Sequence, residues 1–214
     1  MAEGSRMKKI LCGAIIAASV SLIVGCQRTR TAQRRAAISS PILRLIVDDA
    51  LEQTTYTRTY DPSYVKLNYP NGDVASDRGV CSDVIVRAFR KGGLDLQKAV
   101  HEDMARNFAA YPHVWNLTKP DPNIDHRRVQ NLATYFTRQG KAREITMNPK
   151  DYQPGDVVVW DTGGGSPHIG IVSNVLSDTA ERFYIVHNIG AGAKLEDALF
   201  SWSIIGHYRY EIIP

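Results

Sequence analysis

The stretch SDRGVCSDVIVRAFRKGG, residues 76–93, combines a single cysteine with the pattern of an amphipathic helix. Apolar side chains recur at helical spacing between residues 84 and 89, and Gly92 and Gly93 end the run. Basic residues occupy the last turns, where the helix dipole favours cations. Cys81 therefore falls in the first turn of the predicted helix, on the side that faces inward.

The N-terminus has the features of a secretory signal. Two lysines precede an uncharged apolar run at 10–24, and the residues up to Cys26 resemble a bacterial lipobox. That resemblance implies cleavage before Cys26 and a lipid on its sulfur. We therefore predict a signal peptide over 1–25, a flexible linker over 26–40 and one domain over 41–214. A plain signal peptide or an N-terminal membrane anchor is the alternative.

The number of cysteines limits the chemistry. Processing would remove Cys12 and block Cys26, so that Cys81 alone would remain free. A lone cysteine forms neither an internal disulfide nor a cysteine-rich zinc site, and no CxxC pair favours a redox protein. We predict no cofactor and no metal.

The net charge of +4 does not belong to the domain. Residues 1–25 carry a net +2 and residues 26–35 a net +4, so the rest of the chain is net −2. A basic segment beside a lipid anchor suits anionic headgroups. Nucleic acid is not an expected partner, because its binding requires a basic patch on the folded domain.

The two halves of the chain differ in pattern. Helices are predicted at 41–54, 96–111 and 128–141, so that a helical insert covers about 94–150. Strands rich in Val, Ile and Tyr follow at 155–161, 168–176, 182–190 and 204–213, joined by short turns that favour antiparallel pairing. The sequence predicts an α+β fold in which the helix of Cys81 packs on an antiparallel sheet.

Two histidines lie in predicted strands where one could act as a base for the Cys81 thiol and the other could orient that base. His168 begins one predicted strand, and His187 lies in the next. Thiol catalysis needs a base that takes the proton of the sulfur, and a polar group that orients the base. Cys81, His168 and His187 can fill these roles in turn, although Asp83 would oppose formation of a thiolate. The alternative is a buried structural cysteine with structural histidines.

Several motifs in order resemble a known family. The stretches YDPSYVKLNYPNGDVASDRGVCSDVIVRAFR (60–90), LDLQKAVHEDM (94–104) and NIDHRRVQNL (123–132) are similar to the DUF1287 family. The order of the Cys81 helix, PGDVVVW, HIGIVS and YIVHNIG resembles NlpC/P60 papain-like cysteine peptidases, which cleave amide bonds in cell-wall stem peptides.

The resemblance to NlpC/P60 implies roles for individual residues. Cys81 would be the nucleophile, His168 the base and His187 the orienting residue, and no metal would take part. The candidates for the oxyanion or substrate site are Tyr60, Asp83 and Asn188, with Tyr56, Tyr64 and Tyr69 competing with Tyr60.

The sequence also departs from the common NlpC/P60 pattern. Val80 precedes the cysteine and Ser82-Asp83 follow it, and the insert separates it widely from His168. Charged residues of the insert either contact an anionic stem peptide or form salt bridges and caps. These residues are His101, Glu102, Asp103, Asp125, His126, Arg127 and Arg128.

The sequence thus predicts an extracytoplasmic, lipid-anchored thiol hydrolase, on the periplasmic side of a bacterial membrane, that acts on an amide bond in peptidoglycan. One alternative is a thiol amidase or acyltransferase with another extracytoplasmic substrate. The other is an inactive envelope lipoprotein that binds or scaffolds.

Overall fold

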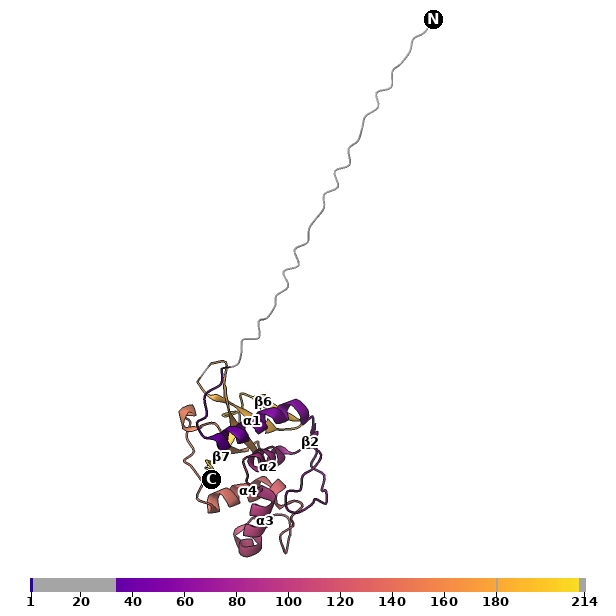
Figure 1. Cartoon of the computed structure of the whole chain (residues 1–214), viewed down its shortest axis with the longest axis vertical. Coiled ribbons are helices and arrows are strands. Elements are labelled where there is room, and N and C mark those ends of the chain that lie inside the picture. Colours follow the sequence, from indigo (N-terminus) through magenta and orange to yellow (C-terminus); the bar gives the residue numbers. More distant parts are fainter. Residues whose placement is uncertain (2–33, 180, 212–214) are drawn as a thin grey trace. The chain divides into compact units, whose positions relative to one another are not determined.

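The computed structural model describes Met1 and residues 34–179 and 181–211 (Figure 1). The predicted signal peptide, the predicted lipidation site Cys26 and the first half of the predicted linker lie outside these residues, apart from Met1. Within the described part of the chain, no helix is long and apolar enough to span a membrane.

Among the described residues, four α-helices precede the main sheet. These helices are α1 (Pro41–Tyr56), α2 (Cys81–Lys91), α3 (Leu96–Asn107) and α4 (Val129–Arg138). The start of α1 is set by Ser40, whose side chain accepts a hydrogen bond from the backbone of Leu43, and by proline in the first turn. Asp95 caps α3 in the same way. Three short 3-10 helices, η1 (Phe108–Ala110), η2 (Asp125–Arg127) and η3 (Pro149–Asp151), complete the helical part.

The second half forms a five-stranded antiparallel sheet of order β6-β5-β4-β3-β7. Its strands are β3 (Val157–Asp161), β4 (Pro167–Leu176), β5 (Phe183–Asn188), β6 (Ala193–Glu196) and β7 (Ser203–Tyr208). Two short strands, β1 (Thr59–Tyr60) and β2 (Arg78–Gly79), pair in parallel beside α2. The predicted α+β fold, with the Cys81 helix packed on an antiparallel sheet, is confirmed.

Strand β6 was not among the predicted elements. Its four residues are AKLE, without the run of β-branched and aromatic side chains that marks the other strands. It forms because its backbone continues the sheet beyond β5, where His187 pairs with Lys194 and Ile185 with Glu196. Sheet pairing therefore decides this strand rather than local propensity.

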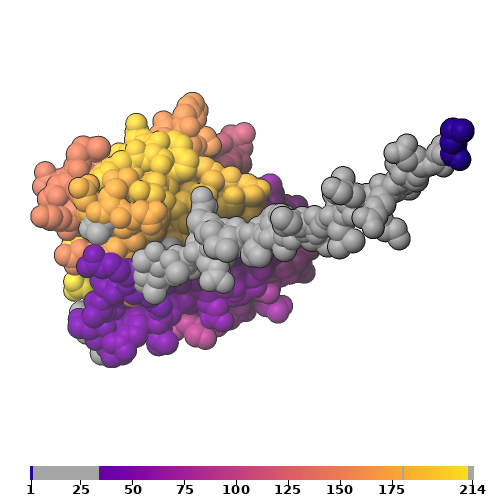
Figure 2. All heavy atoms as spheres, turned by 90° about the horizontal axis from the view of Figure 1, so that it is seen from above, coloured from indigo at the N-terminus to yellow at the C-terminus, as the bar shows by residue number. Residues whose placement is uncertain are grey.

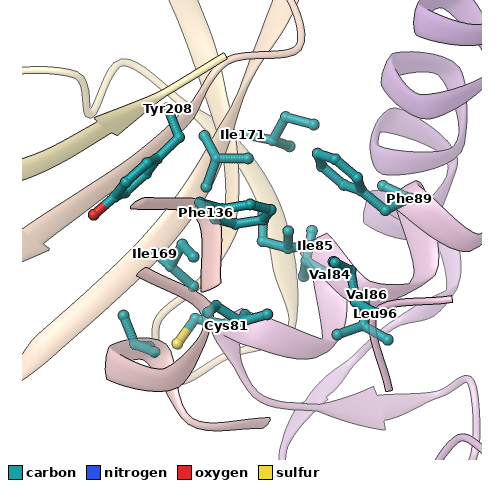
Figure 3. Packing of buried hydrophobic residues seen from close by; sticks show 14 of the residues in the cluster. Cys81, Val84, Ile85, Val86, Phe89, Leu96, Phe136, Ile169, Ile171 and Tyr208 are labelled. Atoms are coloured by element: carbon teal, nitrogen blue, oxygen red, sulfur yellow. The ribbon is translucent and has the colours of Figure 1, made fainter. Parts of the chain in front are cut away.

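Side chains pack on both sides of the sheet. On one side, apolar side chains of α2 and α4 form one cluster with side chains of β3, β4 and β7, among them Phe136, Ile169 and Tyr208 (Figure 3). On the other side, a smaller core gathers around Trp160, Val172 and Ile185. Figure 2 shows the sheet-forming second half, orange to yellow, lying against the earlier part of the chain in purple. Cys81 belongs to the larger core, at the end of α2 nearest to the start of β4.

The end of the predicted linker pairs with the sheet. Arg35 forms a β-bridge with Val175, and the backbone N–H of Ala36 donates to the carbonyl of Asn174 at 2.8 Å. Ile38 is buried. Residues 34–36 therefore lie along the strand β4, because their backbone pairs with that of Asn174 to Leu176.

Candidate active site

Cys81 is the first residue of α2, and its thiol is free. The turn before it is held by Asp83, whose Oδ2 accepts a hydrogen bond from the backbone N–H of Val80 at 2.7 Å. Gly79 has φ of 155°, and a Cβ at this position would lie 2.8 Å from the same oxygen. Glycine at 79 thus permits the tight turn that places Cys81 at the helix start.

The thiol of Cys81 is buried, and burial raises its pKa to about 11. Backbone hydrogen bonds from Ile169, Ser82 and Cys81 lower this pKa, and the charge of Asp83 raises it. The sulfur is therefore protonated at neutral pH, and Asp83 opposes the thiolate as the sequence predicted. The same backbone N–H groups are available to stabilise negative charge that develops near the sulfur.

The charge of Asp83 is balanced by Arg127 from the insert. Both side chains are almost fully buried, and Nε of Arg127 lies 3.0 Å from Oδ1 of Asp83. Arg127 also donates to the carbonyl oxygens of Ser63 at 2.8 Å and Asp61 at 3.0 Å. The guanidinium thereby ties the first turn of α2 to the loop that follows Tyr60.

The two predicted histidines are in direct contact. Nε2 of His168 lies 2.8 Å from Nδ1 of His187, and Nε2 of His187 lies 3.0 Å from Oε2 of Glu196. The ring of His168 also stacks on Trp160, with centroids 5.9 Å apart, and meets Trp202 edge-on. Sequence reasoning found both histidines but missed Glu196, because that residue lies in the unpredicted strand β6.

The contact with Glu196 determines which ring nitrogens of His187 and His168 carry hydrogen. A carboxylate only accepts hydrogen bonds, so Nε2 of His187 carries the hydrogen, and Nδ1 of neutral His187 must accept. Nδ1 therefore accepts from Nε2–H of His168, which leaves the lone pair of the neutral His168 ring on Nδ1. That nitrogen is free to act as a base.

The pKa values of both histidines are lowered. Burial, followed by the neighbouring His187, lowers the pKa of His168 to about 3. Burial also lowers the pKa of His187, while Glu196 acts in the opposite direction. At neutral pH, His168 is thus an uncharged imidazole, and the resting pair is a thiol with a neutral base rather than an ion pair.

Cys81 lies against the strand that carries His168. The backbone N–H of Ile169 faces the sulfur, and Pro167 lines the same cavity as Cys81. His168 stands between these two residues at the start of β4. Figure 3 shows Cys81 beneath Ile169 at the first turn of α2. Among the described residues, Sγ of Cys81 and the His168 ring share no hydrogen bond, so proton transfer requires the ring and the sulfur to approach.

Tyr60 and Asn188 also lie near Cys81. Tyr60 precedes the loop held by Arg127, lines the cavity of Cys81, and has a pKa raised by burial and then by Cys81. Asn188 donates from Nδ2 to the carbonyl of Gly79 at 2.9 Å, which joins the end of β5 to the turn before α2. The competing Tyr64 bonds to Asp121 instead.

Most of the charged residues of the insert are paired within the protein. His101 contacts Asp125, Asp103 pairs with Arg138, and Glu102 lies 4.0 Å from Lys98. His126 is buried, with its pKa lowered to about 4 by that burial. For these residues the structure favours salt bridges and packing over contact with a ligand. Arg128 is the exception.

A cavity of about 200 Å³ opens beside the cysteine. Tyr60, Cys81 and Pro167 contribute to its wall from the domain, and Arg127 and Arg128 from the insert. A side chain or short peptide fits this volume better than a large cofactor. Cys81 thus borders a small cavity, and His168 follows the cavity residue Pro167 in the chain without itself lining the cavity.

Comparison with known proteins identifies the family to which the chain belongs. The model of DUF1287, a domain of unknown function, matches residues 47–210. The chain therefore belongs to the DUF1287 family, as its motifs predicted. The uncharacterized protein YijF of Escherichia coli (strain K12) is 55% identical over 165 residues, which are 77% of this chain and 80% of YijF.

A solved structure shows a more distant likeness. It is the crystal structure of a protein from Staphylococcus aureus subsp. aureus Mu50 described as similar to lipoprotein, of the NLP/P60 family. The TM-score is 0.40 at 15% identity, and the match covers 85% of this chain and 44% of the staphylococcal chain.

Proposed function

We propose that this protein is a thiol hydrolase that cleaves an amide bond in the peptide stems of peptidoglycan. The observation that supports this proposal is the hydrogen-bonded series His168–His187–Glu196 at the strand next to Cys81, with distances of 2.8 and 3.0 Å. The two histidines are buried whereas the Glu196 side chain is 45% exposed, so the series costs desolvation at its histidines. It leaves one nitrogen of His168 free, on the residue before Ile169, whose backbone N–H faces the only free thiol of the described residues.

In the proposed reaction, Sγ of Cys81 attacks the amide carbonyl carbon, and the thiol proton passes to Nδ1 of His168. The tetrahedral oxyanion is stabilised by backbone N–H groups at the start of α2 and by the hydroxyl of Tyr60. Collapse breaks the C–N bond, and the amine leaves with the proton from His168. A thioester remains on Cys81.

Water then completes the cycle. His168 takes a proton from the water, the resulting hydroxide adds to the thioester carbonyl, and the S–C bond breaks. The acid product leaves, and the proton returns to the sulfur. Because both the thiol and the imidazole are neutral at rest, proton transfer and attack occur together, and no preformed thiolate is needed.

The proposed location follows from the N-terminal sequence. A signal peptide with lipid on Cys26 would tether the domain to a bacterial membrane, on the periplasmic side. The peptide stems of the cell wall lie within reach of such a tether. Peptidoglycan is therefore the first substrate to test.

A second candidate function is an inactive envelope protein that binds but does not cleave. It is favoured by the resting state of the site, in which the Cys81 thiol is buried and shares no hydrogen bond with His168 among the described residues. A third candidate is a thiol amidase or acyltransferase that uses the same residues on another extracytoplasmic substrate.

Digestion of purified peptidoglycan by the full-length protein tests these candidates, with the products read by mass spectrometry. We expect new fragments with the wild type and none with Cys81→Ala. Ser173→Ala, at a buried serine of β4, is a matched control that should keep activity. Fragments that persist in Cys81→Ala would exclude Cys81 as the nucleophile. No fragments together with a Cys81 that resists iodoacetamide would favour the binding protein, and a reactive Cys81 without fragments would favour another substrate.

A further inference from the structure

Two adjacent arginines of the insert line the Cys81 cavity, and their side chains differ in their partners. Arg127 is used within the protein, since it bonds to Asp83 and to the carbonyls of Ser63 and Asp61. The side chain of Arg128 makes no ion pair and no hydrogen bond among the described residues, and its Nη1 is buried without a partner. Burial of an unpaired guanidinium nitrogen costs free energy, which a bound anion would recover.

The guanidinium of Arg128 is held in place by an aromatic ring. Its central carbon lies 4.1 Å from the centroid of the Trp115 ring. Stacking of this kind orients the planar group and leaves its N–H edge available for two parallel hydrogen bonds. Trp115 and Arg128 both belong to the insert, so the insert supplies a fixed cation at the wall of the cavity.

The carboxylates nearest to Arg128 do not neutralise it by contact. Asp121 and Asp125 raise its pKa through their charges, whereas burial, the larger effect, lowers it. Asp121 is engaged with Tyr64 and Asn123, and Asp125 with His101. The only charged residues in the described wall of the cavity are the two arginines. Because Asp83 balances Arg127, Arg128 supplies the unpaired positive charge in the wall of the cavity.

We propose that Arg128, stacked on Trp115, binds a carboxylate of the substrate close to the amide bond that Cys81 attacks. The assignment of the bound carboxylate to a substrate rests on the proposed function, whereas the existence of an anion site at Arg128 does not. The substrate class is a peptide that carries a free carboxylate within the approximately 200 Å³ cavity, next to its reacting carbonyl. Arg128 is thus a residue that determines specificity, and the insert selects the substrate.

Two alkylating reagents of nearly the same size test this inference on the full-length protein. Iodoacetate carries a carboxylate, iodoacetamide does not, and both alkylate the sulfur of Cys81. We expect Arg128→Met to lower the ratio of the iodoacetate rate to the iodoacetamide rate about tenfold, as for loss of a charge-assisted hydrogen bond. Arg106→Met removes the same charge from an exposed position of α3, and it should leave the ratio unchanged.

The outcomes separate the inference from the proposed function. A ratio that is the same in the wild type and in Arg128→Met, with both reagents reacting, would overturn the carboxylate site and leave the hydrolase intact. If Cys81 reacts with neither reagent, the peptidoglycan digestion decides the hydrolase, and binding of succinate decides the anion site. Succinate should then shift the Nε–H resonance of Arg128 in the NMR spectrum, whereas neutral succinamide should not. No shift would overturn the site.

Discussion

The proton on His187 depends on a single carboxylate, that of Glu196. In the wild type, this carboxylate accepts from Nε2–H of His187 and thereby leaves Nδ1 of His168 as the free base. Glu196→Gln replaces an acceptor by a group that can also donate, which allows the reversed order of donors along the series. Nδ1 of His168 would then carry the hydrogen and could not accept the thiol proton.

We expect Glu196→Gln to slow alkylation of Cys81 by iodoacetamide, or kcat/KM once a substrate is known, by about 10- to 100-fold. Loss of the negative charge also lowers the pKa of the histidines, so the acidic limb of the pH profile should move to lower pH. Glu52→Gln, at an exposed site of α1, is the matched control. A slower reaction with an unmoved acidic limb would mean that Glu196 only supports the fold.

The proposed catalytic residues could be selected from the sequence, whereas the groups that contact them could not. Cys81 and the histidines stand out because thiol chemistry needs these residue types at a helix start and in neighbouring strands. Glu196 and Arg128 are ordinary charged residues in the sequence. Their importance depends on what does or does not contact them, and only the fold determines that.

At the scale of elements, the start of α2 depends on the insert. Arg127, from η2, reaches across to Asp83 in the first turn of α2, and both side chains are at most 3% exposed. Arg127→Met leaves the Asp83 carboxylate buried without its cation. We expect a loss of about 3–5 kcal/mol in the free energy of unfolding, measured by urea denaturation, since breaking a buried pair strands one charge.

A double mutant separates this charge effect from lost packing. Asp83→Asn combined with Arg127→Met removes both charges, while the amide oxygen introduced at position 83 could still accept from the backbone of Val80. The double mutant should recover more than half of the free energy of unfolding that Arg127→Met alone loses, which would indicate strong coupling between the two residues. Additive losses would show that Asp83 and Arg127 act independently.

Regular elements with a strong pattern were predictable, and the weakly patterned β6 was not. The helix at Cys81 and the strands at 157–161 and 167–176 follow from apolar periodicity and β-branched residues. Residues 34–36 also lack such a pattern, but they pair with Asn174 to Leu176, the end of β4 that extends beyond its pairing with β3. Pairing of this kind is a tertiary property, and local sequence does not encode it.

At the scale of the whole domain, the site forms where the helical part meets the sheet. The proposed nucleophile comes from α2, the proposed base and its orienting groups from three strands, and the proposed anion site from the insert. Each contributor is buried at least in part against another. Changes that loosen the contact between the helices and the sheet should therefore reduce both stability and reactivity.

At the scale of the whole domain, the buried histidines predict that acid lowers the free energy of unfolding. In the folded state, the pKa values of His126 and His168 are about 4 and about 3, and an unfolded histidine has a pKa of about 6.5. The unfolded state therefore binds more protons below pH 6.5, so stability is complete above that pH and is lost as the pH falls. Between pH 7 and pH 5, we expect each of the two histidines to cost about 2 kcal/mol of the free energy of unfolding. The slope of the free energy of unfolding against pH gives the number of protons taken up on unfolding. His126→Gln should reduce this number by one, measured by urea denaturation at several pH values. An unchanged slope would show that His126 is protonated in the folded protein.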